Sequence, residues 1–266
     1  KPTIGEVSLD RGGEDPSWGG APITFSRVQG ADICGQIVAV GVGVDPTRIG
    51  QRVITDNWLR DPRDLKNKNR TGYFGSECDG GFAEFAAIPG RNALVVNSSL
   101  SDAELATFSC AYSTAEGMLS RANVDAEDTV LVSGASGGVG GALIQLAKIR
   151  GARVIALASR SKHEAVSALG ADRLLGRAPI DLQSELREED VSVVADVVGG
   201  DLFADLIDVL ERGGRYTCSG AIAGPIVSLD LRTFYLRDLT FTGSTVIDLE
   251  VMPKLVRYIE EGAIKP

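Results

Sequence analysis

A glycine-rich turn at residues 133–141 has the residue types and the spacing to bind phosphate groups. It follows a short apolar run and precedes apolar residues at helical spacing, so we expect a strand, a turn and a helix in that order. Its central glycines let the backbone approach a phosphate, and Gly140 lets the helix pack close to the strand. We therefore expect the pyrophosphate of a dinucleotide to bind at Ser136, Gly137, Gly138 and Val139. A glycine-rich turn without a ligand is the alternative.

A second group of polar residues follows the next apolar run, at residues 153–158. An acidic residue at the end of this strand would accept hydrogen bonds from a ribose 2′-hydroxyl and would favour NAD. The sequence has no acid at this place and offers hydroxyls and two cations instead, among them Ser159, Arg160 and Lys162. These residues predict a site for a 2′-phosphate and therefore NADP(H) as the cofactor. A basic surface turn at the start of a helix is the alternative.

The composition is typical of a globular protein with neither a membrane nor a nucleic acid as partner. The 266 residues are 44% hydrophobic and 24% charged, and no apolar run approaches the roughly 20 residues that span a bilayer. The first residues show no signal-peptide pattern. A net charge of −9 argues against binding to a phosphate backbone. The four cysteines form no C-x-x-C pair and suit free thiols, so we expect a cytoplasmic protein that acts on a small molecule.

Short apolar runs in the first hundred residues predict a small β-domain. Strands are expected at 33–40, 50–54, 80–88 and 93–96. Turn residues separate them, which is typical of a barrel-like arrangement. The polar and basic segment 56–72 is expected to be a solvated loop.

The pattern changes at residues 101–104, where a capping serine and acidic residues predict the start of a helix. Strands are expected at 129–133, 154–158, 191–198, 214–218 and 239–242, and helices at 113–121, 139–150, 161–169, 201–211 and 252–261. This alternation predicts an α/β fold with a doubly wound parallel sheet of the Rossmann type. We expect 226–229 and 239–242 to be outer strands whose apolar edge pairs with a second copy of the chain in a homodimer.

Taken together, these motifs resemble the medium-chain dehydrogenase/reductase superfamily, in particular its quinone oxidoreductases and zinc-less alcohol dehydrogenases. The matching segments occur in the family's order, at 29–41, 80–85, 110–115, 133–141, 169–172, 196–200 and 213–215. The resemblance implies a GroES-like β-barrel domain at 1–105, a Rossmann NADP-binding domain at 106–252 and a helix at 253–266 that leads back toward the β-domain. It also implies that the barrel is incomplete, because the family's opening strands and closing return do not occur in the sequence.

The resemblance further implies an active site in the cleft between the two domains. Additional cofactor contacts would come from Thr114, Val198, Gly199, Ser219, Gly220, Ala221, Thr242, Gly243 and Ser244. The candidates for catalysis are Tyr112, Ser113 and Thr114, although Tyr112 is equally expected to be a core residue. Asp32 could bind substrate, but the matching acid of the family is mostly structural. No residue is a convincing proton donor, and reduction of a quinone or an enone can take its proton from solvent.

The same resemblance argues against zinc. The zinc enzymes of the family place a histidine ligand where this sequence has Ala31, and alanine offers no ligand atom. Cys110 stands where those enzymes keep a zinc cysteine, but one thiolate with at most a carboxylate nearby is a poor three-ligand site. Residues 56–78 replace the family's structural zinc lobe and contain only one cysteine, Cys78. We expect neither the catalytic zinc nor the structural zinc.

These observations predict an NADPH-dependent oxidoreductase that transfers hydride to a small carbonyl, quinone or enone without zinc. A short-chain reductase is one alternative, because the glycine turn also fits that class. However, the sequence lacks its Tyr-x-x-x-Lys pair, and much of the chain precedes the nucleotide-binding strand. An NADPH-binding sensor or structural protein without turnover is the other alternative.

Overall fold

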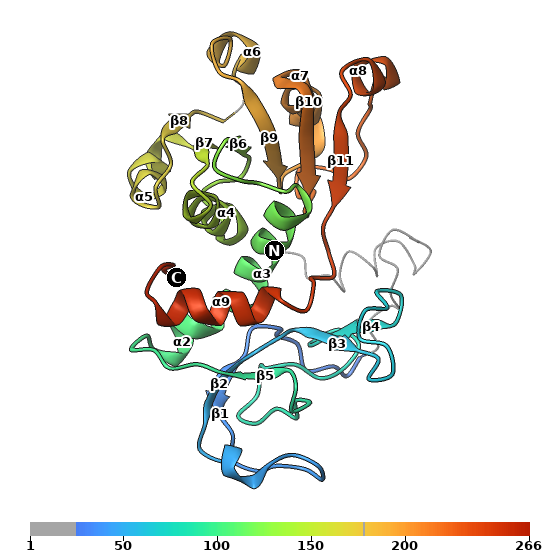
Figure 1. The fold of residues 1–266 in the computed structure, drawn as a ribbon, viewed down its shortest axis with the longest axis vertical. Helices are drawn as coiled ribbons and strands as arrows, with labels where there is room; N and C mark the ends of the chain where they lie inside the picture. The colour runs from blue at the N-terminus through green and yellow to red at the C-terminus, as the bar shows by residue number, and fades with distance from the viewer. Residues whose placement is uncertain (1–24, 178) are drawn as a thin grey trace. The chain divides into compact units, whose positions relative to one another are not determined.

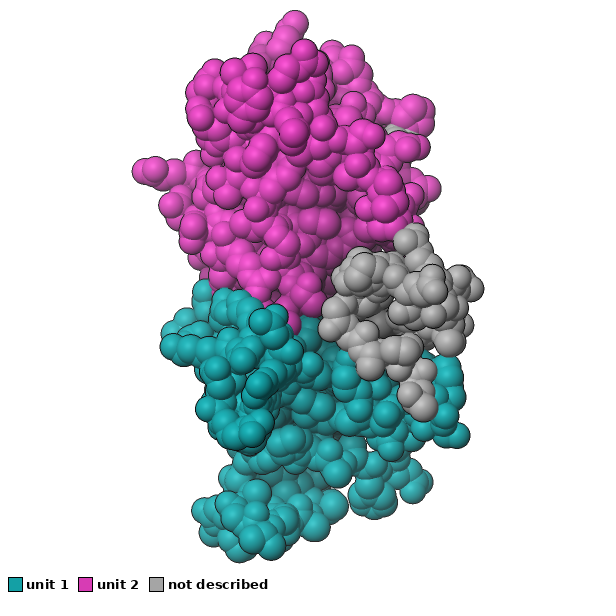
Figure 2. All heavy atoms as spheres, turned by 90° about the vertical axis from the view of Figure 1, so that its right-hand side faces the viewer, with its two compact units in different colours: residues 1–110, 248–266 teal, residues 111–247 magenta. Residues whose placement is uncertain are grey.

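The computed structural model describes residues 25–177 and 179–266. The chain forms two compact units, drawn in different colours in Figure 2. The first unit comprises Lys1–Cys110 and Asp248–Pro266, and the second comprises Ala111–Ile247. No helix among the described residues is long and apolar enough to cross a membrane.

The first unit contains antiparallel strands (Figure 1). One sheet has the order β1-β2-β5, with β1 at Cys34–Gln36, β2 at Arg52–Thr55 and β5 at Ala93–Val95. A separate hairpin pairs β3, Trp58–Arg60, with β4, Thr71–Tyr73, and a short 3-10 turn, η2, spans Pro46–Arg48. Ile54 in β2 is fully buried, so the central strand carries apolar residues into the core.

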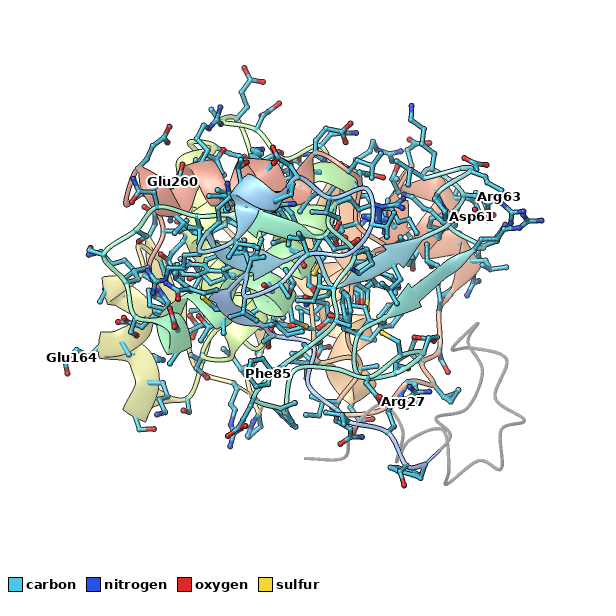
Figure 3. All side chains as sticks on the ribbon, turned by 90° about the horizontal axis from the view of Figure 1, so that it is seen from below. Arg27, Asp61, Arg63, Phe85, Glu164 and Glu260 are labelled. Atoms are coloured by element: carbon cyan, nitrogen blue, oxygen red, sulfur yellow. The ribbon has the colours of Figure 1, made fainter. Side chains whose placement is uncertain are left out.

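The hairpin replaces the solvated loop that the sequence predicts at 56–72. The rings of Trp58 and Tyr73 pack edge to face with centroids 4.8 Å apart, which stabilises the pairing of β3 with β4. In the connection between them, Asp61 accepts hydrogen bonds from the guanidinium of Arg63 at 3.0 and 3.1 Å, and the two residues lie together in Figure 3. The polar composition therefore describes the turn and not the strands that flank it.

The strand predicted at 80–88 is not present among the described residues of the first unit. The first N–H groups of this segment bond instead to the carbonyls of residues 28–30, at 2.7–2.9 Å. Phe82 and Phe85 are then largely exposed, with 78% and 74% of their surface accessible. A strand needs a continuous ladder, and these few bonds do not continue along the segment. The strand predicted at 33–40 shortens to β1 for the same reason.

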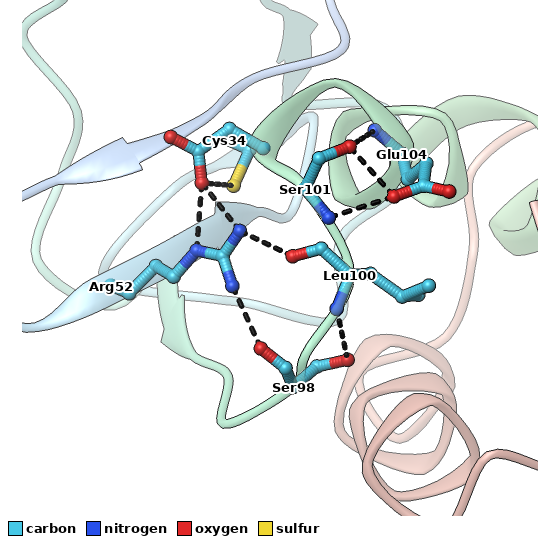
Figure 4. A network of polar contacts seen from close by, with 7 residues as sticks. Cys34, Arg52, Ser98, Leu100, Ser101 and Glu104 are labelled. Atoms are coloured by element: carbon cyan, nitrogen blue, oxygen red, sulfur yellow. Dashed lines mark hydrogen bonds and ion pairs between the residues drawn. The ribbon is translucent and has the colours of Figure 1, made fainter.

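The predicted helix start at 101–104 is confirmed. Helix α2, Asp102–Ala106, begins with a capping box in which Ser101 and Glu104 bond reciprocally to each other's backbone N–H groups. Arg52 of β2 binds the segment that leads into this helix and the first residue of the helix (Figure 4). Its guanidinium donates to the carbonyls of Ser98 and Leu100 at 2.9 and 2.6 Å, and to the carboxylate of Asp102 at 2.7 Å.

The last helix, α9 at Val251–Glu260, belongs to the first unit although it follows the second unit in sequence. Its buried residues are Val251, Met252, Leu255, Tyr258 and Ile259, the spacing of one apolar helix face. Glu260 accepts a 2.8 Å hydrogen bond from the backbone N–H of Asn97, beyond β5. Lys68 forms an ion pair with Asp248 at 2.8 Å.

The second unit contains a six-stranded parallel sheet of order β11-β10-β9-β6-β7-β8. Its strands are β6 (Thr129–Val132), β7 (Arg153–Leu157), β8 (Arg173–Leu175), β9 (Val191–Asp196), β10 (Leu210–Cys218) and β11 (Thr240–Gly243). Its α-helices are α4 (Gly138–Ile149), α5 (His163–Ala168), α6 (Leu182–Glu185), α7 (Phe203–Asp208) and α8 (Leu231–Leu236), and α3 spans Phe108–Arg121. Strand order runs outward in both directions from β6, so the predicted doubly wound Rossmann sheet is confirmed.

The order of the sheet follows from where its apolar residues lie. All six residues of β9 are buried, as expected for a central strand that is covered on both faces. Strand β11 is one of the two outer strands of the sheet, which confirms an outer strand near 239–242. Residues 226–229 form no strand, and Ile226 is 82% exposed, so the second outer strand expected from the sequence is wrong.

Candidate functional site

The predicted cofactor residues meet at one edge of the parallel sheet. They follow the carboxyl ends of five strands: 136–139 after β6, 159–162 after β7, 198–199 after β9, 219–221 after β10, and 242–244 at the end of β11. Parallel strands place their carboxyl ends at the same edge, where ligands of doubly wound folds bind. Thr114 comes instead from helix α3, and a Cβ on Gly138 would lie 3.4 Å from the Cβ of Ala111 in that helix. All these residues belong to the second unit.

The glycine turn leaves the N-terminus of α4 open. Its N-cap is Gly137, which has no side chain to bond the first N–H groups, and the first turn carries no acidic residue. Ser136, Gly137 and Gly138 are exposed. Free N–H groups at the start of this 12-residue helix form a site for an anion.

Gly140 brings the helix against the turn. A Cβ at this position would lie 2.2 Å from the carbonyl oxygen of Gly134 and 2.7 Å from the Cα of Ala135, so no side chain fits. Gly134 itself has a positive φ of 58°, a conformation that glycine adopts without strain. The close approach of helix and strand expected from the sequence is therefore present.

Two cations stand at the end of β7. Arg160 and Lys162 lie in a 3-10 turn, η3 at Arg160–Lys162, and both are exposed. Neither forms an ion pair with another described residue. The hydroxyls of Ser159 and Ser161 lie 3.3 Å apart in the same turn. Ala158, which follows the last residue of β7, is not an acid, so the turn exposes two cations and two hydroxyls, groups that can bind an anion.

A buried carboxylate orients the loop that follows β9. Asp196 is fully buried and accepts hydrogen bonds from the hydroxyls of Ser133 and Tyr216, the latter at 2.7 Å. It also accepts from the backbone N–H groups of Val198 at 2.8 Å and Gly199 at 3.2 Å. Burial and this carboxylate raise the pKa of Tyr216, so its hydroxyl stays a donor. This role of Asp196 is not evident from the sequence, because its hydroxyl partners Ser133 and Tyr216 are distant in the chain.

The loops after β10 and β11 are joined by hydrogen bonds. The hydroxyl of Ser219 donates to the carbonyl of Ser244 at 2.6 Å, and the N–H of Ser244 donates to the carbonyl of Cys218 at 2.9 Å. Gly220 and Ala221 remain accessible, whereas Ser244 is only 2% exposed. Thr242 is half-buried, and its hydroxyl lies 3.4 Å from the carbonyl of Tyr216. Ser244 is therefore a buried residue that holds these two loops together, and its side chain is not exposed at the carboxyl ends of the strands.

The catalytic candidates of helix α3 are mostly core residues. Tyr112 and Ser113 are buried, and Thr114 is half-buried. The hydroxyl of Tyr112 accepts a 2.7 Å hydrogen bond from the side-chain amide of Gln145 in α4. Burial raises the pKa of Tyr112 to about 12, against a smaller opposing effect of Gln145. These contacts favour the core interpretation of Tyr112.

A second polar site lies within the first unit, which we call the Tyr73 cluster: Asp32, Asn57, Tyr73 and Cys110. The carboxylate of Asp32 accepts a 2.8 Å hydrogen bond from the N–H of Cys110. The side-chain amide of Asn57 lies 3.2 Å from the hydroxyl of Tyr73. Desolvation raises the pKa of Asp32, opposed by the N–H of Cys110 and by Asn57. Sequence reasoning missed Asn57 and Tyr73, because only the β3–β4 hairpin brings them together.

Comparison with known proteins agrees with this architecture. Residues 11–98 match the family model described as alcohol dehydrogenase GroES-like domain, and residues 138–261 match the one described as zinc-binding dehydrogenase. The acryloyl-coenzyme A reductase of Metallosphaera sedula is 31% identical over 252 residues, which are 91% of this chain and 75% of that protein. The chain belongs to the medium-chain dehydrogenase/reductase superfamily.

Two further members of the superfamily are similar to the chain. The NAD-dependent alcohol dehydrogenase of Sulfolobus acidocaldarius is 26% identical over 261 residues, covering 91% of this chain and 74% of that protein. A crystal structure of a putative alcohol dehydrogenase from Sinorhizobium meliloti 1021 is 50% identical with a TM-score of 0.86, and covers 92% of this chain and 68% of that one. The chain is thus an oxidoreductase whose family binds a nicotinamide cofactor, which excludes the short-chain reductase alternative.

The residues at the family's zinc position do not fit the metal. Ala31 offers no ligand atom, and Asp32 is engaged by the backbone N–H of Cys110. Across 25–177 and 179–266, no group of three or more histidine, cysteine, aspartate or glutamate side chains is arranged to hold a metal ion. A catalytic zinc needs three protein ligands, and the Tyr73 cluster supplies two at most.

Proposed function

We propose that the protein is an NADPH-dependent oxidoreductase that transfers a hydride to a small carbonyl, quinone or enone without zinc. The observation that carries the choice of cofactor is the turn after β7, where Arg160 and Lys162 are exposed and no acid stands at the strand end. A dianionic 2′-phosphate would meet two cations there, whereas a ribose hydroxyl would find no carboxylate.

The remaining contacts of the cofactor are assigned to the same sheet edge. The N-terminus of α4, with Ser136 to Val139, would bind the pyrophosphate. The loops at Val198–Gly199, Ser219–Ala221 and Thr242–Ser244, together with Thr114, would surround the nicotinamide half. When bound, the reduced nicotinamide supplies the hydride, and the protein contributes orientation and the exclusion of water. Asp196 keeps Val198 and Gly199 in place for this task.

The screen that tests this function measures NADPH and NADH oxidation against 1,4-benzoquinone, cyclohex-2-enone, benzaldehyde and acryloyl-coenzyme A. The last probe is included because the Metallosphaera sedula relative is named for it, and NADH because the Sulfolobus acidocaldarius relative is named as NAD-dependent. We expect turnover with at least one probe and a preference for NADPH. Tight NADPH binding without oxidation by any probe would support a sensor or structural protein instead.

The absence of zinc has its own test. We expect elemental analysis of the purified protein to find far less than one zinc per chain, because Ala31 supplies no ligand. One tightly held zinc per chain would contradict the proposed mechanism.

We also propose that the protein is a homodimer joined through the second unit. The segment between β10 and β11 exposes several large apolar side chains, namely Ile222, Ile226, Leu231, Tyr235 and Leu236. The nearby strand β11 is an outer strand of its sheet. An apolar surface beside a sheet edge favours pairing with a symmetry mate.

A further inference from the structure

The turn at 159–162 lies beside the segment that follows the next strand of the sheet. Strands β7 and β8 are parallel neighbours (Figure 1). The N–H of Ala158 donates to the carbonyl of Leu175 at 3.1 Å, so the pairing extends one step beyond both strands and sets Ala158 opposite Gly176. The residue that follows, Arg177, therefore leaves the sheet next to the turn.

The imidazole of His163 ends this pairing. In a continuing parallel ladder, the carbonyl of Ala158 would accept a hydrogen bond from the N–H of Arg177. It accepts instead from Nε2 of His163 at 3.1 Å, so the backbone of Arg177 is released from the sheet. The same bond ties the start of α5 to the end of β7. The N–H of Lys162 donates to the carbonyl of Ser159 at 2.8 Å, and these two bonds fix the shape of the turn.

The side chain of Arg177 is available to a ligand. It is exposed and forms no ion pair with another residue of 25–177 and 179–266, whereas Arg173 at the start of β8 is paired to two glutamates. The next acid along the chain, Asp181, caps α6 by accepting from the N–H of Ser184 at 3.0 Å. A Cβ on Gly176 would meet no atom of the described residues within 4 Å, so there is room for a ligand beside this backbone.

We propose that Arg177 binds the 2′-phosphate of the cofactor as a third cation beside Arg160 and Lys162, and that it is a further determinant of the preference for NADPH. This inference rests on the proposed NADPH-dependent function. A phosphate group of this kind carries about two negative charges and has oxygens that accept strong hydrogen bonds. A guanidinium can bind two of these oxygens at once, whereas an ammonium acts as a point charge. Groups from two neighbouring strand ends would then hold the phosphate from two sides.

The test measures the affinity of the full chain for NADPH, NADH and adenosine 2′,5′-bisphosphate by calorimetry. The bisphosphate has the 2′-phosphate and no nicotinamide, so it confines the readout to the adenosine end and needs no turnover. We expect Arg177→Ala to weaken NADPH and the bisphosphate by about tenfold, because charge-assisted hydrogen bonds are partly screened at an exposed site. The affinity for NADH should be unchanged. Arg177→Lys keeps the charge and should lose less than Arg177→Ala.

Arg187→Ala is the matched control, because it removes the same charge from the same unit. Arg187 is exposed, pairs with its neighbour Glu188 at 3.5 Å, and lies shortly before the start of β9, near the opposite edge of the sheet. This variant should bind all three ligands as the wild type does. The thermal unfolding midpoint should be the same in all variants, since both arginines are exposed.

Equal losses for NADPH and NADH in Arg177→Ala, an unchanged affinity for the bisphosphate, or the same losses in Arg187→Ala would each overturn the assignment of Arg177. An Arg177→Lys variant that loses as much as Arg177→Ala would also overturn it. A wild type that binds NADH as tightly as NADPH would instead contradict the proposed choice of cofactor, which keeps the two failures distinct.

Discussion

The hydroxyl of Tyr216 donates a 2.7 Å hydrogen bond to the carboxylate of Asp196, and both side chains are buried at the carboxyl ends of neighbouring strands. The same carboxylate accepts hydrogen bonds from the hydroxyl of Ser133, which follows the neighbouring strand on the other side of β9, and from two N–H groups of its own loop. One buried acid therefore links three strands to the loop that is assigned to the nicotinamide.

Replacing Asp196 by asparagine should destabilise the protein. The amide has one oxygen where the carboxylate has two, and its NH2 group would face hydroxyl and N–H donors. We expect Asp196→Asn to lower the free energy of unfolding by about 2–4 kcal/mol. Urea unfolding measures this, with the exposed Asp205→Asn as a control that should stay within about 0.5 kcal/mol of the wild type. A similar small change in both variants would show that the hydrogen bonds of Asp196 contribute little.

Substitution by alanine should have different effects on stability at two glycines of the turn. In Gly140→Ala the new methyl meets backbone atoms at 2.2 and 2.7 Å, so we expect a loss of about 1–3 kcal/mol in stability. In Gly138→Ala the nearest atom is the Cβ of Ala111 at 3.4 Å, so stability should be retained. The methyl would, however, stand where we propose that the phosphates bind, so NADPH binding should weaken. Urea unfolding and NADPH titration together separate the two effects, and a stable Gly140→Ala would contradict the close approach.

Acid should remove a contribution to stability from Asp172. Desolvation alone would raise the pKa of this carboxyl, but the N–H of Val154 at 2.7 Å and the ammonium of Lys148 at 2.9 Å lower it overall. A carboxyl whose pKa is lower in the folded state contributes stability above its unfolded pKa of about 4. That contribution is lost as the pH falls through the lower, folded value.

The measurement is urea unfolding of the wild type and Asp172→Asn at neutral pH and at about pH 3. The variant has no such contribution to lose, so the gap in unfolding free energy should narrow on acidification. The exposed Asp190→Asn should show no such trend. A gap that stays constant with pH would mean that Asp172 has no depressed pKa.

Arg160→Ala should change the affinity for NADPH and not for NADH. Hydrogen bonds to charged groups contribute roughly 1.5–3 kcal/mol, less where solvent screens them. The lower part of that range corresponds to about a tenfold loss in NADPH affinity. NADH has no 2′-phosphate, so its affinity should be unchanged, and Ala158→Asp should narrow or reverse the preference. Fluorescence titrations at several salt concentrations test this, with Arg187→Ala, an exposed arginine paired to Glu188, as control. Equal losses for both cofactors would contradict the phosphate assignment.

Leu231→Glu should separate the proposed homodimer. Leu231 is 66% exposed at the start of α8, and a carboxylate there would be desolvated if this surface is buried between two copies. We expect light scattering at micromolar concentration to give a dimer mass for the wild type and a monomer mass for the variant. Val42→Glu, at a fully exposed position of the first unit, should remain dimeric. A wild type of monomer mass would refute the dimer.

The parts of the fold that local sequence determines were predictable. The glycine turn, the strand before it and the capping box at Ser101 depend on neighbours within a few residues, and all three are present. Segment 80–88 has a strand-like composition, but its backbone bonds to residues 28–30 and not to a ladder. Pairing partners are distant in sequence, and composition does not reveal them.

The same limit applies to the candidate sites. The residues proposed for the cofactor could be predicted to lie at one end of the sheet, because parallel topology brings the carboxyl ends of strands together, but their contact with a cofactor stays a prediction. Asn57 and Tyr73 meet only through the register of a hairpin whose polar sequence is typical of a loop. Asp196 stands in a predicted strand, but its role depends on Ser133 and Tyr216, whose positions follow from the order of the sheet.

Helix α9 has a consequence for how the chain folds during synthesis. The second unit, Ala111–Ile247, is complete in the growing polypeptide before any residue of α9 has been made. Glu260, which bonds to the N–H of Asn97, is added more than a hundred and fifty residues later. The parallel sheet can therefore form its core while the ribosome still holds the chain, whereas the β-strands made first must wait. We expect a chain that ends at residue 247 and has been released from the ribosome to protect the second unit from protease and to leave the earlier strands open to cleavage.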